Sequence, residues 1–140
     1  MADAKIRIRD LHKSFGPKQV LRGIDLDVER GESLVVIGGS GSGKSVLLKH
    51  VIGLLTPDRG TVEIDGVDVH SLGNRELVDF RRRFGMAFQE GALFDSMTVR
   101  GNVAFPLVRQ TDLSRQEIDA RVDECLSMVK LEGISEKLPS

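Results

Sequence analysis

The chain has 140 residues, a formal net charge of −1, 40% hydrophobic and 29% charged residues, which is the composition of an ordinary soluble globular domain. A net charge this small gives no general attraction to nucleic acid, so we expect no nucleic-acid partner. There is no long uncharged apolar run, and the first residues lack the hydrophobic stretch of a signal peptide, so a cytoplasmic protein is predicted. The one cysteine, Cys125, cannot form an internal disulfide, in keeping with a reducing compartment.

The first thirty residues predict an antiparallel β element. Ala4, Ile6 and Ile8 alternate with charged residues, a pattern typical of a strand with one solvated face. Segment 11–17 then interrupts the strand with a Gly-Pro turn. A second alternating strand is expected at 24–28.

The segment 38–45, with the sequence GGSGSGKS, satisfies the phosphate-binding pattern G-x-x-x-x-G-K-S/T. The apolar run 34–37 precedes it as an expected buried strand, and a helix is expected from there to about Leu55. Backbone N–H groups and a helix N-terminus can together bind an oxyanion. Lys44 would reach the β- and γ-phosphates of ATP, and the Ser45 hydroxyl would ligate Mg²⁺. The residues expected to bind the nucleotide are Gly38, Ser40, Gly41, Ser42, Gly43, Lys44 and Ser45.

The middle of the chain predicts a hairpin and a short helix. The pair 65–66, Asp-Gly, joins two alternating segments, 61–64 and 67–69, and so predicts a type I′ turn. Asn74 can cap a helix that ends near the three arginines 81–83, which we expect to form a solvated helix end.

From residue 84 onward the pattern changes from strand to helix. The apolar run 84–88 is expected as a second buried strand that delivers Gln89 at its end. Thr98 can cap a short helix that Pro106 would end.

A longer helix is expected near the end of the sequence. Ser114 and Glu117 have the spacing of a capping box, and Gly133 is placed to close the helix. Its apolar face would carry Ile118, Val122, Cys125, Leu126 and Val129.

Together these residues resemble the ATP-binding subunits of ABC transporters, and the match runs over essentially the whole chain. Segment 11–16 is similar to the family segment that places an aromatic ring, here Phe15, against adenine. Segment 38–45 corresponds to the family's P-loop. Phe88 and Gln89 resemble the Q-loop, which implies that Gln89 contacts Mg²⁺ and the attacking water and senses the membrane partner.

The resemblance implies an α/β fold of the P-loop NTPase class, ABC ATPase type. Residues 1–94 would form an N-terminal antiparallel β element and a partial RecA-like nucleotide-binding core. Residues 95–140 would begin the helical subdomain.

Segment 88–99, together with 102–107, is similar to the Mla/Mce-type ATPases, which energise phospholipid movement between bacterial membranes. Gly101 departs from the Glu that is common there and should weaken the helix slightly. The resemblance implies a homodimer of ATPase subunits on the cytoplasmic face of the inner membrane, with an integral membrane permease docked near 89–107. Phe94, Met97 and Phe105 are either interior to the helical part or exposed in that docking groove.

Three family elements do not occur in these 140 residues: the signature motif, the Walker B strand with its catalytic glutamate, and the switch histidine. The three histidines, His12, His50 and His70, lie too early and are interpreted as ordinary surface or packing residues. Catalytic roles would fall to Lys44 and Gln89. We therefore expect this chain, as an N-terminal portion, to bind ATP at most and not to hydrolyse it.

Other functions stay open on the sequence alone. The chain could serve another ABC importer or exporter, or be a non-transport P-loop protein such as a small-molecule kinase. It could also be a binding module that no longer catalyses, or a shortened protein. Phe15 could be a plain core aromatic, and Gln89 an exposed loop amide.

Overall fold

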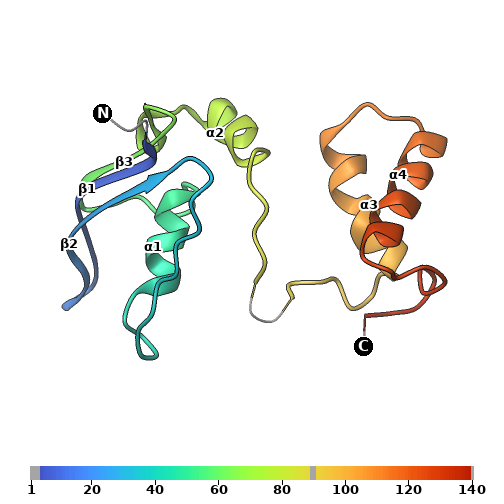
Figure 1. Cartoon of the computed structure of the whole chain (residues 1–140), viewed down its shortest axis with the longest axis horizontal. Coiled ribbons are helices and arrows are strands. Elements are labelled where there is room, and N and C mark those ends of the chain that lie inside the picture. The colour runs from blue at the N-terminus through green and yellow to red at the C-terminus, as the bar shows by residue number, and fades with distance from the viewer. Residues whose placement is uncertain (1–3, 89–90, 140) are drawn as a thin grey trace. The chain divides into compact units, whose positions relative to one another are not determined.

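The computed structural model describes residues 4–88 and 91–139. It divides into two compact units, Met1–Gly85 and Met86–Ser140 (Figure 1). The functional boundary expected at 94/95 stays a prediction. No helix in the described ranges is long and apolar enough to cross a membrane.

The first unit contains a four-stranded antiparallel sheet with the strand order β2-β1-β3-β4. The strands are β1 (Ala4–Phe15), β2 (Lys18–Glu29), β3 (Arg59–Ile64) and β4 (Val67–Asp68). The antiparallel β element expected from the sequence is therefore present.

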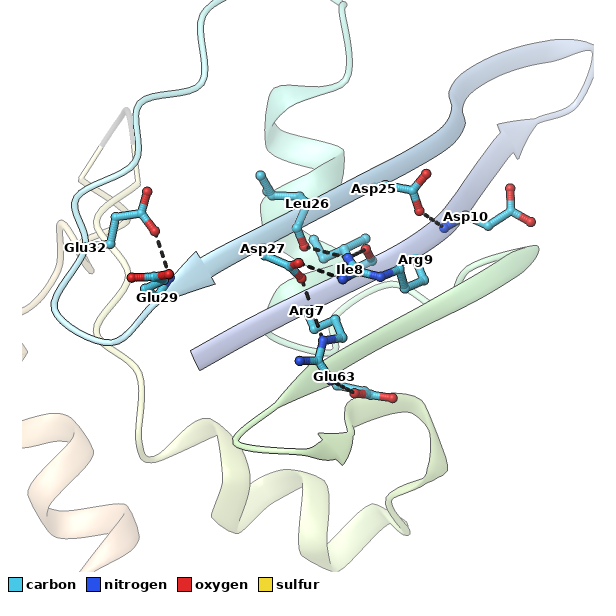
Figure 2. A network of polar contacts seen from close by, with 10 residues as sticks. All are labelled: Arg7, Ile8, Arg9, Asp10, Asp25, Leu26, Asp27, Glu29, Glu32 and Glu63. Atoms are coloured by element: carbon cyan, nitrogen blue, oxygen red, sulfur yellow. Dashed lines mark hydrogen bonds and ion pairs between the residues drawn. The ribbon is translucent and has the colours of Figure 1, made fainter. Parts of the chain in front are cut away.

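The Gly-Pro turn is present at residues 16–17, but the interruption begins later than expected, because β1 continues to Phe15. A bulge at Asp10, whose φ is +46°, absorbs the irregular pattern. Strict alternation would place Ile8 and Leu11 on opposite faces, but the extra residue lets both be fully buried. The Asp10 N–H donates to the Asp25 carboxylate at 2.8 Å, which holds the bulge against β2 (Figure 2).

The solvated face of the sheet carries alternating charges, as the strand pattern predicts. Arg7 of β1 lies 3.8 Å from both Asp27 of β2 and Glu63 of β3, and Arg9 pairs with Asp27 at 2.6 Å (Figure 2). Exposed ion pairs such as these add little to stability.

The predicted type I′ turn is confirmed, because Asp65 and Gly66 both have positive φ, at +49° and +76°. The short 3₁₀ helix η1 (Val69–Ser71) and helix α2 (Asn74–Arg81) follow. The N-cap of α2 is Gly73 and not Asn74, and the Gly73 N–H donates to the Glu76 carboxylate at 2.8 Å.

Of the three arginines 81–83, Arg82 and Arg83 are exposed as predicted, whereas Arg81 is partly buried. The Arg81 guanidinium donates to the carbonyl oxygens of Ile52 and Gly53, at 3.2 and 2.5 Å. Ile52 and Gly53 directly follow helix α1 (Lys44–Val51). Arg81 thereby satisfies carbonyl groups that the C-terminal end of α1 leaves without a hydrogen-bond donor.

Helix α1 (Lys44–Val51) packs on the sheet and ends four residues before the expected Leu55. Leu47 and His50 are its buried residues. The core beneath them consists mainly of Ile8, Leu11, Leu21, Val62, Ile64, Val69 and Phe80.

Two of the histidines are packing residues, as predicted. His50 is fully buried, with Nδ1 2.7 Å from the Val46 carbonyl oxygen. The His70 ring meets it edge-on at 6.2 Å between centroids. Burial lowers the pKa of His70, which favours its neutral form.

The expected buried strands 34–37 and 84–88 are wrong. Neither segment forms a strand, and Val35 and Ile37 expose 77% and 91% of their surface. A strand is stable only beside a hydrogen-bonded neighbour, and no described strand pairs with either segment.

The second unit contains α3 (Val99–Gln110) and α4 (Arg115–Met128). Thr98 caps α3 as predicted, with its hydroxyl accepting from the Gly101 N–H at 3.1 Å. Pro106 does not end the helix but lies inside it. A proline costs an interior helix one hydrogen bond and a local distortion, which α3 evidently tolerates.

The capping box at the start of α4 is confirmed, since Ser114 accepts from the Glu117 N–H and Glu117 accepts from the Ser114 N–H. Gly133 does not close the helix. Lys130, at φ +58°, takes the left-handed position, and the N–H of Leu131 donates to the Leu126 carbonyl at 2.9 Å. Of the expected apolar face, Val122 and Leu126 are buried.

Candidate functional site

The P-loop connects the end of segment 34–37 to α1, and two of its glycines have conformations that disfavour side chains. Gly41 has φ +74° and Gly43 has φ +102°. A side chain on Gly43 would also lie 3.0 Å from Val20 and 3.1 Å from Leu21. Glycine therefore lets the loop lie directly against β2.

The first turn of α1 offers free backbone donors. The Leu47 N–H is the first to bond within the helix, to the Gly43 carbonyl at 2.8 Å. The N–H groups of Lys44, Ser45 and Val46 precede it and therefore have no carbonyl partner within the helix. Such a terminus attracts anions, because the helix dipole is positive there.

The Lys44 ammonium is turned back over the loop. It donates to the carbonyl oxygens of Gly38 and Gly39 at 2.7 and 2.9 Å. Phosphate oxygens could replace these two carbonyl acceptors without any change in the donor.

A hollow of about 290 Å³ lies beside the loop. Its walls are Phe15, Lys18, Val20 and the run 41–46. Phe15 comes from the end of β1, and 47% of its surface is exposed, so it is not a plain core aromatic. The Lys13 ammonium lies 5.8 Å from the centre of its ring.

The structure thus brings together Phe15 and the loop residues 41–45, which the sequence placed in one site. Gly38 and Ser40 belong to the same loop but do not line the hollow. Gln89 lies outside the described residues. Lys18 and Val20 were missed, although a tight turn after Phe15 brings Lys18 opposite it in the strand register.

These residues fit a nucleotide with its metal. Of the residues that the structure describes, two ammonium groups and no carboxylate line the hollow, which suits a polyanion. Across the described part of the chain, no three His, Cys, Asp or Glu side chains gather to hold a metal. A magnesium ion bound by one hydroxyl, phosphate oxygens and water does not need such a cluster.

Comparison with known proteins identifies the family. The ABC transporter family model matches residues 21–140. The chain belongs to the ABC transporter family. Its fold is that of an ABC ATPase, with the antiparallel sheet at the N-terminus and only part of the nucleotide core.

Two curated relatives and one solved structure illustrate the match. The chain is 45% identical over 134 residues to a probable ribonucleotide transport ATP-binding protein, mkl, from Mycobacterium leprae, covering 96% of this chain and 39% of that one. It is 42% identical to the chloroplastic protein TRIGALACTOSYLDIACYLGLYCEROL 3 of Arabidopsis thaliana, in a match that covers 99% of this chain and 40% of that protein. One solved structure that matches is a dimeric ATP-binding cassette in a post-hydrolysis state, bound to ADP and Pi. The sequence identity is 31% and the TM-score is 0.83, and the match covers 96% of this chain and 61% of that one.

The chain therefore spans about two fifths of the length of these curated relatives and about three fifths of that solved cassette. Complete ABC ATPases bind ATP with Mg²⁺ and hydrolyse it, and they work as dimers within transporter complexes. For this chain, the described residues include the P-loop at the start of α1.

The helical unit shows where two of the expected docking residues lie. Phe94 exposes 47% of its surface, and its ring packs at a tilt against that of Phe105 in α3, with 4.8 Å between the ring centroids. The Asn102 side chain holds the Phe94 backbone through hydrogen bonds of 2.8 and 3.1 Å. The aromatic pair is thus fixed in place and remains partly accessible.

Proposed function

We propose that the complete protein is the ATP-hydrolysing subunit of an ABC transporter that moves phospholipid between bacterial membranes. The proposal that the chain binds ATP rests on the hollow between Phe15 and the P-loop, with the N-terminus of α1 and Lys44 beside it. Both the family match and the donor set support an anionic ligand at that point.

Each residue would have a distinct role toward Mg-ATP. The Phe15 ring would stack on the base, and the N–H groups of 41–45 would hold the phosphates. Lys44 would neutralise charge on the transferred phosphoryl group, and Ser45 would ligate Mg²⁺. The metal, when bound, would withdraw charge from the phosphate oxygens. Gln89 would ligate Mg²⁺ and orient water, as the family resemblance implies.

Hydrolysis also needs a group that accepts the proton of the attacking water. Among residues 4–88 and 91–139, no carboxylate lines the hollow. We therefore infer that this chain binds ATP and ADP without turnover, and that hydrolysis belongs to the complete subunit. Steady-state phosphate release from the chain, abolished by Lys44→Ala, would contradict this part of the proposal.

The partners are inferred from the family and from segment 88–107. A homodimer at the cytoplasmic face of the inner membrane would bind a permease through the Phe94–Phe105 pair, of which Phe94 is exposed and Phe105 is half-buried. In the complete subunit, Phe94→Asp and Phe105→Asp should reduce co-purification with the permease but leave nucleotide binding intact. Val108→Asp is the matched control, because Val108 is also an exposed apolar residue of α3. If Phe94→Asp and Phe105→Asp co-purify with the permease as well as the Val108→Asp control does, the Phe94–Phe105 pair is not the docking surface.

Phospholipid is the proposed cargo for two reasons. Segment 88–107 resembles the Mla/Mce type, and one relative carries a diacylglycerol lipid in its name. Another relative is named for ribonucleotide transport, so a different cargo is the competing candidate. The complete subunit and its permease, placed in liposomes with a fluorescent phospholipid and a labelled ribonucleotide, decide between them by which compound moves when ATP is added. A small-molecule kinase would instead transfer phosphate to an acceptor.

A further inference from the structure

Lys18 is a second cation beside the P-loop, and the sequence motif does not include it. It is the first residue of β2 and lies opposite Phe15 in the strand register. Its ammonium nitrogen lies 4.0 Å from where a Cβ on Gly41 would be. The absence of a side chain at Gly41 therefore leaves open space between this ammonium and the loop backbone.

Lys18 differs from many cations of the same sheet. In the described ranges no carboxylate lies within ion-pair distance of its ammonium, whereas other basic side chains on the sheet are paired. Those pairs are Lys5 with Asp65 at 2.6 Å, Lys13 with Asp58 at 2.8 Å and Arg59 with Asp10 at 2.7 Å.

The hollow is charged at two places. Lys44 and Lys18 are the only charged residues that line it in the part of the chain described. Lys44 bonds to the carbonyls of Gly38 and Gly39, whereas Lys18 lies near Gly41, on the wall shared with Phe15. Val46, which also lines the hollow, offers no polar side chain.

We propose that Lys18 binds a phosphate oxygen of the nucleotide, on the side of the P-loop nearest Phe15. The inference rests on the proposed function, because it assumes that a nucleotide phosphate chain occupies the loop. Lys18 lines the same hollow as Phe15 and Lys44, so a nucleotide with its base on Phe15 and its terminal phosphates at Lys44 would share that hollow with the Lys18 ammonium. A lysine that meets a phosphate forms a charge-assisted hydrogen bond, which is stronger than a neutral one.

The test is titration of the protein with Mg-ADP and with Mg-pyrophosphate, which has no base. Lys18→Gln keeps the length of the side chain and removes its charge. It should weaken binding of both ligands by about tenfold, in line with loss of one charge-assisted hydrogen bond. Lys18→Arg should bind within about threefold of the unsubstituted protein, because the charge is kept. Lys49→Gln is the matched control, since Lys49 is in the last turn of α1 and outside the hollow.

Ionic strength gives a second readout. The affinity difference between the unsubstituted protein and Lys18→Gln should narrow as salt rises from about 0.05 to 0.5 M, because an exposed charge contact is screened. Equal affinity of Lys18→Gln and the unsubstituted protein for both ligands would overturn the role of Lys18 and leave the proposed function standing. Weaker binding of Mg-ADP alone would place Lys18 on the base or sugar, and would also overturn the proposal. Failure of the unsubstituted protein to bind either ligand would overturn both.

Discussion

Gly38 and Ser42 lie against each other across the P-loop, so that a methyl group on Gly38 would be 2.6 Å from the Ser42 hydroxyl oxygen. We expect Gly38→Ala to displace the Ser42 hydroxyl within the loop and to weaken Mg-ADP binding by about threefold, the cost of losing part of one hydrogen bond, while α1 and the sheet stay folded. Removal of the opposing hydroxyl should relieve the overlap, so the double variant Gly38→Ala with Ser42→Ala should regain most of the affinity. Titration of the single and double variants measures this coupling, and purely additive losses would argue against it.

Asp65 joins three parts of the first unit. Lys5 lies 2.6 Å from its carboxylate, Arg30 lies 2.8 Å away, and Arg83 is also bonded to it. These cations, chiefly the hydrogen bond from Lys5, lower the pKa of Asp65 from 3.8 to about 2. A lowered pKa means that the folded state binds the proton less readily than the unfolded chain does.

The stabilisation from Asp65 should therefore be complete above about pH 4 and fade as the pH falls toward 2. Asp65→Asn should lower the unfolding midpoint at pH 7, and the difference from the unsubstituted protein should shrink at pH 2–3. Asp112→Asn removes the same charge from a residue that forms no ion pair with any other described residue, and should change the midpoint little. Thermal unfolding followed by circular dichroism across this pH range is the measurement. A difference that is constant with pH would exclude the ionised carboxylate as its cause.

Gly60 lies directly beneath the bulge of β1. A Cβ there would be 2.3 Å from the Asp10 carbonyl oxygen and 2.4 Å from that of Arg9, and its φ is +93°. Gly60→Ala should cost about 2–5 kcal/mol in free energy of unfolding, since strain and overlap add. Gly66→Ala also has positive φ but meets nothing within 4 Å, so it should cost only about 1 kcal/mol. Urea unfolding of the two variants tests the contrast, and similar costs would mean that the close approach to the bulge is unimportant.

Lys130 occupies the left-handed position that ends α4. Lys130→Gly should stabilise the helical unit by about 0.5–1 kcal/mol, because relief of backbone strain exceeds the added entropy of the unfolded chain. Lys130→Ala removes the same charge and keeps the strain, so it should bring no such gain. Denaturant midpoints of the two variants decide the matter. A gain shared by both would trace the effect to the lost charge.

Local signals in the sequence were read correctly where one or two residues determine the backbone. The Asp65-Gly66 turn, the Thr98 cap and the Ser114 capping box depend on a single turn or hydrogen bond, and all three are confirmed. The P-loop also follows from its own glycines. The length of β1 was underestimated, because a bulge at Asp10 is not visible in an alternation pattern.

Features that depend on partners distant in the sequence could not be predicted from composition. The apolar run 34–37 has the sequence of a buried strand, yet no described strand lies beside it. The left-handed residue that closes α4 is Lys130, not Gly133. The end of α4 likewise depends on how far along the helix the buried residues, Val122 and Leu126, extend. Lys18 was missed because its place beside Gly41 arises from a hairpin folding back on the P-loop.

Titration of the chain with Mg-ATP, with and without Lys44→Ala, tests the central claim most directly. We expect saturable binding by the unsubstituted protein and a loss of at least about tenfold in affinity for Lys44→Ala, since the ammonium would contact the phosphates. An unsubstituted protein that is folded and takes up no Mg-ATP, or a variant that binds it equally well, would contradict nucleotide binding at this loop.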